Sequence, residues 1–255
     1  MTRIIDLSLP HQNFASEPYP PTITHTDHQE GARRLAKLVN AEPGDFKDGI
    51  GLASDNISGS THSGTHVDAP WHYGPVCGGA RAKTIDEVPL AWCYGDGVLL
   101  DMRHKAPGAE ITPDDIKTAL ANIKYTLKPG DIVLLHTGAD TFWNTTSYMA
   151  SQPGLGRAGT AYLLDCGVRM IGIDAWGIDR AAPAMAEAYR TGDKAALWPA
   201  HFYGREREYL HLEKLANLDQ LPRPTGFKVC AFPVKFEKCS AGWTRAVAII
   251  EEEQS

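Results

Sequence analysis

The residues most able to do chemistry lie in one short segment, HSGTHVDAPWH, residues 62–72. His62, His66 and Asp68 fall within seven residues, and His72 follows four residues after the aspartate. Imidazole nitrogen together with carboxylate oxygen suits Zn²⁺, Mn²⁺ or Fe²⁺, with geometry and availability selecting among them. A chance cluster of histidines on a polar loop is the alternative, but three histidines and an aspartate in eleven residues favour a metal site.

The backbone of this segment is predicted to be irregular. His62 and His66 would share one face of a helix, but Gly64 between them and the sequence Asp-Ala-Pro after them disfavour a regular helix. Gly64 permits a sharp turn, and Pro70 stiffens the chain beyond Asp68. We therefore predict that the segment forms a loop or an irregular turn.

The segment resembles the HxGTHxDxPxH motif of the cyclase family, which includes bacterial kynurenine formamidases, isatin hydrolases and trans-dienelactone hydrolases. Every fixed position of the motif matches. Three further segments are similar to family segments: DLSLP near the start, RMIGID with Asp179 after it, and EKLANLDQLP from Glu213. The resemblance therefore spans nearly the whole chain.

The resemblance also implies a set of metal ligands. His62, His66 and Asp68 would bind a first divalent ion, Zn or Mn. His201 and Glu213 lie twelve residues apart, as the family's second pair does, and would bind a second ion, with Asp68 and Glu213 bridging the two. Without the resemblance, His201 and Glu213 would pass for ordinary residues, the latter in a helical-looking stretch.

The chemistry that follows is hydrolysis. A bound divalent metal lowers the pKa of water from about 15.7 toward about 7, which makes hydroxide available at neutral pH. The hydroxide would attack an amide or ester carbonyl while the metal stabilises the oxyanion. The resemblance gives His72 the acid/base role, and an ordinary histidine pKa near about 6.5 suits it. We predict cleavage of a C–N or C–O bond.

Departures from the family concern the substrate. Kynurenine formamidases carry a substrate-stacking Trp in the loop after the opening strand, where this chain has NFASEPYPP. Trp176 and Gly177 replace the usual small residues, and there is extra length around residues 24–58. These features favour a small cyclic amide or lactone, isatin- or dienelactone-like, over N-formylkynurenine, the arylformamidase alternative. The candidate aromatic wall of the pocket comprises Phe14, Trp71, Tyr73, Trp176 and Phe202, and the alternative for each is an ordinary core position.

Two other classes of protein compete with a hydrolase. His66-x-Asp68 with the distant His201 mimics the two-histidine, one-carboxylate triad of non-haem iron oxygenases. Those enzymes usually have all-β scaffolds, and the triad would leave His62 and Glu213 unused. A non-catalytic, metal-stabilised binding protein is the third class, and it would need no acid/base residue.

Alternating strand and helix patterns predict an α/β fold rather than a bundle or a sandwich. Strands are expected at residues 3–9, 98–102, 130–138, 169–174, 227–236 and 244–252, and helices at 30–39, 111–123 and 157–168. Thr112 is the expected N-cap of the second helix, with Pro113 at its first position. The resemblance implies one domain, residues 1–255, of the swivelling β/α type with a central mixed sheet.

Composition excludes several functions. The net charge is −6 without a run of Lys or Arg, which argues against nucleic acid and anionic membranes as partners. No apolar stretch approaches the length of a membrane span, and the first residues lack the apolar core of a secretory signal. Five scattered cysteines without a CxxC pair indicate reduced thiols. We predict a cytoplasmic enzyme with a small-molecule substrate, and the resemblance implies a homodimer or homotetramer.

Overall fold

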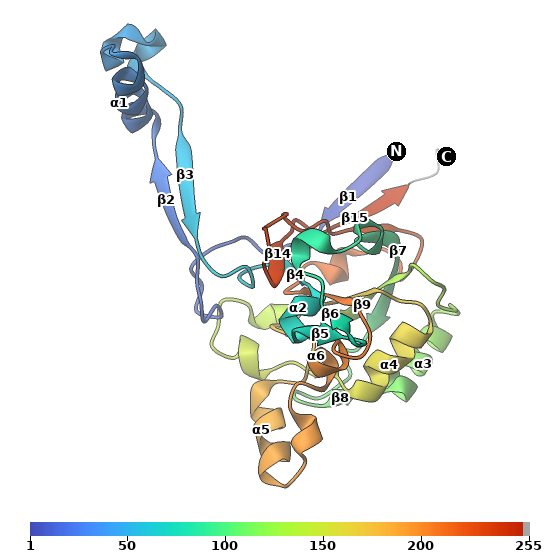
Figure 1. The fold of residues 1–255 in the computed structure, drawn as a ribbon. Helices are drawn as coiled ribbons and strands as arrows, with labels where there is room; N and C mark the ends of the chain where they lie inside the picture. Colours follow the sequence, from blue (N-terminus) through green and yellow to red (C-terminus); the bar gives the residue numbers. More distant parts are fainter. Residues whose placement is uncertain (252–255) are drawn as a thin grey trace. The chain divides into compact units, whose positions relative to one another are not determined.

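The computed structural model of the chain describes residues 1–251 and divides into two compact units. The larger unit comprises residues 1–18 and the chain from residue 61 onward, and the smaller comprises residues 19–60 (Figure 1). Two units of one chain can still make up one functional domain, so the assignment of residues 1–255 to a single domain stays a prediction.

A mixed sheet forms the centre of the larger unit. Within the described chain it has nine strands in the order β1-β15-β13-β7-β9-β11-β12-β4-β14. Their bounds are β1 Thr2–Asp6, β15 Val247–Glu251, β13 Lys228–Cys230, β7 Tyr94–Asp101, β9 Ile132–His136, β11 Met170–Ile173, β12 Leu210–Glu213, β4 His66–Asp68 and β14 Ala241–Trp243. Strands β7, β9, β11 and β12 run parallel, whereas every other neighbouring pair is antiparallel. The predicted α/β class with a central mixed sheet is confirmed.

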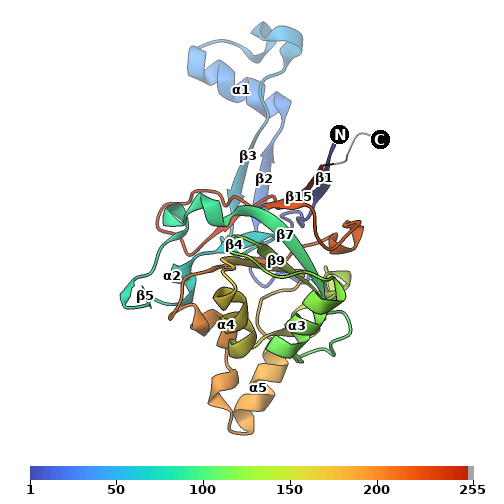
Figure 2. The same cartoon turned by 90° about the vertical axis from the view of Figure 1, so that its right-hand side faces the viewer.

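The central strands are buried on both faces, which explains their continuous apolar sequences. In β9, Val133 and Leu135 belong to one core cluster, and Ile132 and Leu134 to the other. Helices α3 (Pro113–Asn122) and α4 (Arg157–Asp165) cover the face of the first cluster (Figure 2). Helix α3 begins as predicted, because Thr112 accepts a hydrogen bond from the backbone amide of Asp115.

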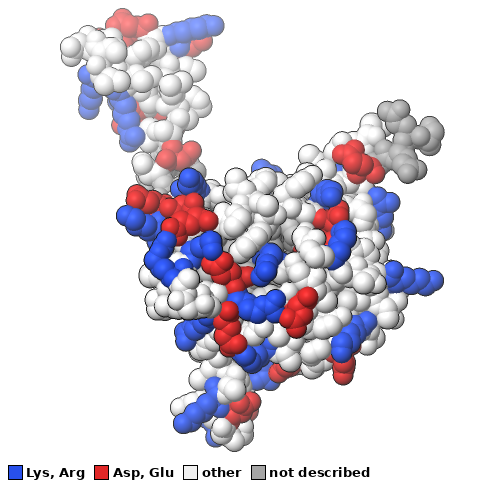
Figure 3. Space-filling view, turned by 45° about the vertical axis from the view of Figure 1, so that its right-hand side comes forward, with Lys and Arg blue, Asp and Glu red and all other residues white. Residues whose placement is uncertain are grey.

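The remaining elements of the larger unit are short. They are the helices α2 Pro70–Tyr73, α5 Ala182–Arg190 and α6 Pro199–Tyr203, the strand pairs β5 Val76–Cys77 with β6 Ala80–Arg81 and β8 Glu110–Ile111 with β10 Gly154–Leu155, and the 3₁₀ helices Ile85–Glu87, Leu90–Trp92, Ala139–Phe142, Tyr148–Ala150, Lys194–Ala196 and Leu218–Gln220. No described helix is long and apolar enough to cross a bilayer. Figure 3 shows Lys and Arg interspersed with Asp and Glu on the visible face of this unit, as expected of a chain without a basic patch.

The smaller unit is a β-hairpin with a helix between its strands. It contains β2 Thr22–Thr26, α1 His28–Val39, the 3₁₀ helices Pro43–Asp45 and Lys47–Gly49, and β3 Ser54–Ser58, which pairs antiparallel with β2. The helix predicted at residues 30–39 is confirmed and begins two residues earlier, where Asp27 accepts a hydrogen bond from Glu30. The two strands carry mostly polar residues, TITHT and SDNIS, so no apolar alternation announces them.

Five of the six predicted strands are shorter in the structure, among them the two late ones. The one expected at residues 227–236 covers only Lys228–Cys230 as β13. Pro233 cannot donate to a ladder, and the chain beyond β13 instead pairs irregularly, with Val234 donating to Trp243. The last strand begins at Val247 rather than residue 244, and residue 252, its predicted end, lies outside the described chain.

Candidate metal centre

Strands β4 and β12 bring four potential ligands to one face of the sheet. Their antiparallel register pairs His66 with Glu213 and Asp68 with His211. Side chains two residues apart on a strand point to the same side, so these four side chains meet on one face. All four are buried. Glu213 therefore lies on a strand, and its predicted helical surroundings are wrong.

The segment 62–72 is only partly the predicted loop. Residues 61–65 form turns, and Gly64 has the left-handed φ of 58° that its predicted sharp turn requires. Residues 66–68 are wrongly predicted, because β12 and β14 pair with them on both sides and complete a strand ladder that the local sequence does not reveal. Pro70 then starts helix α2, which carries His72.

The four imidazoles that the sequence singles out lie beside the carboxylates of Asp68 and Glu213. The nitrogen–oxygen distances are 2.8 Å for His62 Nδ1–Asp68 Oδ1, 3.2 Å for His66 Nε2–Asp68 Oδ1, 3.9 Å for His72 Nε2–Asp68 Oδ2, and 3.9 Å from His201 Nε2 to both Asp68 Oδ2 and Glu213 Oε1. The structure thus brings together every residue that the sequence singles out as a metal ligand or as the acid/base group.

Hydrogen bonds outside the cluster orient two of these imidazoles. His66 Nδ1 donates to the carbonyl of Gly64 at 2.9 Å, which leaves Nε2 facing the carboxylates. His201 Nδ1 bonds the carboxylate of Asp179, and Asp179 also accepts the backbone amide of Ala200 at the start of α6. Such outer partners fix the tautomer and orientation of metal-binding histidines. Both side chains therefore have the arrangement of metal ligands.

Buried polar atoms at the centre of the cluster lack partners. Among the described residues, His66 Nε2, Asp68 Oδ2 and His211 Nδ1 have no hydrogen bond. An unsatisfied buried polar group costs about 1–3 kcal/mol, and divalent cations bound in the cluster would satisfy these atoms. Nitrogen and carboxylate donors in this number fit Zn²⁺ or Mn²⁺. The residues present therefore fit a metal ion.

Electrostatics divide the cluster into charged and neutral groups. Burial opposes the charge of Asp68, but the imidazoles of His72 and His62 outweigh it and hold the pKa of that carboxyl well below its usual range. Burial dominates for His72 and lowers its pKa to about 4. For His201, burial is outweighed by the neighbouring Asp179, which raises the pKa to about 9, and a metal ion would displace that proton.

The cluster is open toward α2. The side chains of His62 and His72 are 26% and 33% exposed, whereas that of Asp68 is fully buried. Trp71, on the same helix, is exposed. A small molecule approaching Asp68 therefore meets His62 and His72 first.

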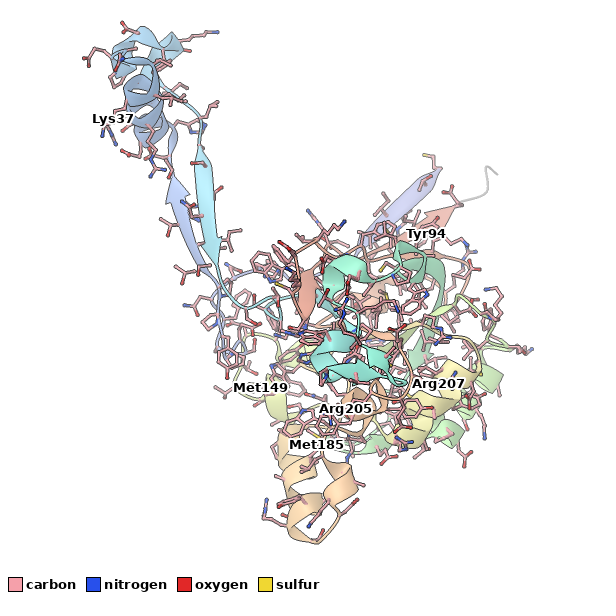
Figure 4. The ribbon with its side chains drawn as sticks, in the orientation of Figure 1. Lys37, Tyr94, Met149, Met185, Arg205 and Arg207 are labelled. Carbon is pink, nitrogen blue, oxygen red and sulfur yellow. The ribbon has the colours of Figure 1, made fainter. Side chains whose placement is uncertain are left out.

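The remaining predicted wall residues lie in different surroundings. Trp176 is half-buried, and Phe202 is exposed with the guanidinium of Arg205 3.9 Å from its ring centre (Figure 4). Phe14 packs edge-on against Trp143, with 5.2 Å between ring centres. Trp143 is an aromatic neighbour that the sequence did not single out.

Tyr73 lies behind the cluster. It is buried, its hydroxyl donates to the carbonyl of Asp68 at 3.4 Å, and it accepts the backbone amide of His211 at 3.0 Å. These bonds tie β4 to β12. The position supports the ligand strands from the core and argues against contact between Tyr73 and a substrate.

A buried ion pair fixes the turn that carries His62. Lys214 Nζ lies 2.7 Å from Glu17 Oε2 and donates to the carbonyl of His62 at 2.9 Å, and Glu17 also accepts the amide of Gly64. Both charged side chains are almost fully buried. The sequence does not reveal this ion pair, because 197 positions separate the two residues.

Removing one partner of this pair should strongly destabilise the protein. Lys214→Met leaves the Glu17 carboxylate buried and uncompensated, so the free energy of unfolding should fall by about 3–5 kcal/mol in urea denaturation. The matched double variant, Lys214→Met with Glu17→Leu, should recover most of that loss. A single variant within about 1 kcal/mol of the parent chain would show that the pair does not fix the turn.

Comparisons with known proteins agree with this geometry. The sequence model of a family described as putative cyclase matches residues 5–180. A kynurenine formamidase of Geobacillus thermodenitrificans is 30% identical over 140 residues, 53% of this chain and 59% of that enzyme, and one of Delftia acidovorans is 27% identical over 197 residues, 75% and 77% of the two chains. Isatin hydrolase A from Labrenzia aggregata superimposes with a TM-score of 0.72 at 22% identity, covering 98% and 94%.

Proposed function

Because this chain belongs to the cyclase family, as its sequence predicted, we propose that it is a metal-dependent hydrolase that opens a small cyclic amide or lactone. The observation that carries the proposal is the register of β4 and β12, which gathers His66, Asp68 and Glu213 on one buried face. The nitrogen of His66 that faces the carboxylates has no other partner among the described residues. A buried face of charged and polar side chains does not stabilise the core by itself, so it is better suited to binding a cation.

We assign roles to the gathered residues as follows. His62, His66 and Asp68 would hold a first ion, and His201 and Glu213 would hold a second. A divalent ion there supplies Lewis-acid chemistry, lowering the pKa of a water and polarising a carbonyl. His72, neutral at pH 7 and open to solvent, accepts a proton at Nε2 and returns it to the leaving nitrogen or oxygen.

In this proposal, the aromatic residues of the candidate wall select the substrate. Trp176, Trp71 and Phe202 offer flat apolar contacts of the kind that hold a planar ring. Phe14 contributes from the opening loop through its contact with Trp143. These aromatics favour a cyclic, aromatic amide or lactone. The two named relatives are kynurenine formamidases, so N-formylkynurenine stays the alternative substrate.

The substrate proposal predicts an order of kcat/KM. Isatin or a dienelactone should be hydrolysed with a higher kcat/KM than N-formylkynurenine. Trp176→Ala should lower the ratio of these kcat/KM values roughly tenfold, because a buried aromatic contact contributes about 0.5–1.5 kcal/mol beyond its area. Side-by-side kinetics on the three substrates measure this. A preference of more than tenfold for the formamide would make arylformamidase the better assignment. Failure to hydrolyse any of them would favour a binding protein.

We also propose that the chain assembles into a homodimer or homotetramer. The smaller unit exposes large apolar side chains, with Leu38 79% and Leu52 73% exposed, as surfaces that pack in an assembly do. Light scattering at micromolar concentration should give at least twice the chain mass of 27.8 kDa. Leu38→Asp with Leu52→Asp should lower that mass, and Leu90→Asp on the larger unit serves as the control. A parent chain that is monomeric would contradict the proposal.

The cytoplasmic location rests on the sequence alone and stays a prediction.

The non-haem iron oxygenase class can be distinguished from a hydrolase by an assay without oxygen. An oxygenase would need O₂, so anaerobic turnover with Zn²⁺ or Mn²⁺ would exclude it. The mixed sheet with helices already differs from the all-β scaffold expected of that class.

A further inference from the structure

His211 is a buried histidine that neither the motif nor the resemblance assigns. It lies on β12 directly opposite Asp68 and shares a strand face with Glu213. Its Nδ1 is 3.7 Å from Asp68 Oδ2 and 3.4 Å from Glu213 Oε1. That nitrogen is fully buried and has no hydrogen bond to any described residue. A polar atom in this state, aimed between two carboxylates, requires a ligand.

The hydrogen bonds behind His211 determine which nitrogen carries its proton. Tyr209 donates its hydroxyl proton to the carbonyl of Ala200 at 2.7 Å, since a carbonyl can only accept. The bond of 2.6 Å between the Tyr209 oxygen and His211 Nε2 is then donated by the imidazole. Nδ1 is left with its lone pair pointing at the carboxylates.

We propose that His211 is an additional metal ligand through Nδ1, completing a donor set with His201, Asp68 and Glu213. The inference rests on the proposed metal centre and adds a second imidazole, beside that of His201, to the second ion's surroundings. Tyr209 is its positioning residue, because the outer hydrogen bond fixes the tautomer and the direction of the ring.

The spacing of the four donor atoms supports this set. All four lie within 4.8 Å of one another. The distances between histidine nitrogens and carboxylate oxygens in the set run from 3.4 to 3.9 Å. Four donors about 2.0–2.1 Å from a tetrahedral zinc are about 3.3 Å apart, so a small inward movement would close the set around the ion. The second carboxylate oxygens of Asp68 and Glu213 stay free for the first ion.

A second cluster of histidine and carboxylate side chains makes a useful contrast. His136, Asp140 and Asp174 also lie within 4.8 Å of one another. The Asp174 carboxylate, however, already accepts bonds from Thr137 and from the amide of Gly138. Its oxygens are satisfied without an ion, whereas Nδ1 of His211 is not.

The test measures metal affinity rather than turnover. Metal-free protein is titrated with Zn²⁺ against a chromophoric chelator, and with Co²⁺ while the visible absorption is followed. His211→Ala and His211→Gln should weaken the Kd of one ion by at least about 100-fold and change the Co²⁺ spectrum, because one nitrogen donor is lost. Tyr209→Phe should weaken it by about 10–100-fold, as loss of an outer partner does.

Leu212→Ala is the matched control. Leu212 is buried on the same strand but points to the opposite face, so its truncation destabilises β12 without removing a donor. The Kd of the Leu212→Ala variant for Zn²⁺ should stay within about threefold of the parent value. Circular dichroism checks folding, and if His211→Ala does not fold, His211→Gln and Tyr209→Phe decide. If the parent chain binds metal and the variants bind it with the same Kd, His211 is not a ligand. If the parent chain binds no metal, the metal centre itself is wrong.

Discussion

Stripping divalent metal from this protein should abolish hydrolysis, and adding back Zn²⁺ or Mn²⁺ should restore it. Asp68 is ionised and buried, and within the described chain His66 Nε2 and His211 Nδ1 beside it have no hydrogen bond, so the ion would supply the charge that polarises a carbonyl at that point. Loss of oxyanion stabilisation alone lowers a rate by about 10²–10³. Loss of the water whose pKa the metal lowers should reduce the rate further. The measurement is kcat/KM before chelation, after it, and after readdition.

The same experiment should move the stability of the protein. Ligands that bind only the native state stabilise it by mass action, by about 2.7 kcal/mol at a hundred times Kd. Readdition should therefore raise Tm together with activity. Mg²⁺ is the control ion, because it prefers oxygen ligands and should restore neither. Full activity in exhaustively chelated, metal-free protein would refute the metal-dependent mechanism.

The sequence identified residues that the structure brings together, but not the backbone that carries them. His62, His66 and Asp68 are close in sequence, so their composition alone indicates a metal. Their strand could not be predicted from residues 66–68, because the ladder that forms it comes from β12 and β14, which are distant in the chain. The central strand at residues 132–136 was predictable, because burial on both faces leaves a continuous apolar run.

The family resemblance extends the predicted ligand set to His201 and Glu213, but not to His211. The first two were assigned only because their spacing matches the family's second pair. His211 has no such counterpart, and its only local signal is its position two residues before Glu213, which would place both on one face if the stretch were known to be a strand. Because that stretch looked helical, the signal was lost. Pairing between distant strands is the information that the single sequence lacks.

His72→Ala should lower kcat by about 10²–10⁴ while most of the metal stays bound. The reason is the position of His72 at the open edge of the cluster. Its Nε2 lies 3.9 Å from Asp68 Oδ2, its ring is 4.1 Å from that of His62, and a third of its side chain is exposed to an incoming substrate. Asp68→Ala, in contrast, should lose metal and activity together, because it removes the carboxylate that faces every imidazole of the cluster.

Metal content measured beside kcat separates the two roles. His72, His62 and Asp68 have donor atoms within 4.8 Å of one another, so the geometry also allows His72 to be a ligand. Two features favour the acid/base role: burial keeps His72 neutral at pH 7, and its exposure gives it access to solvent protons. Trp71→Ala, next to it on α2, tests for disturbance of the helix: it should keep the metal, and because Trp71 is a proposed substrate contact its loss should raise KM more than it lowers kcat. If His72→Ala loses its metal as Asp68→Ala does, His72 is a ligand and the proton must move through another group.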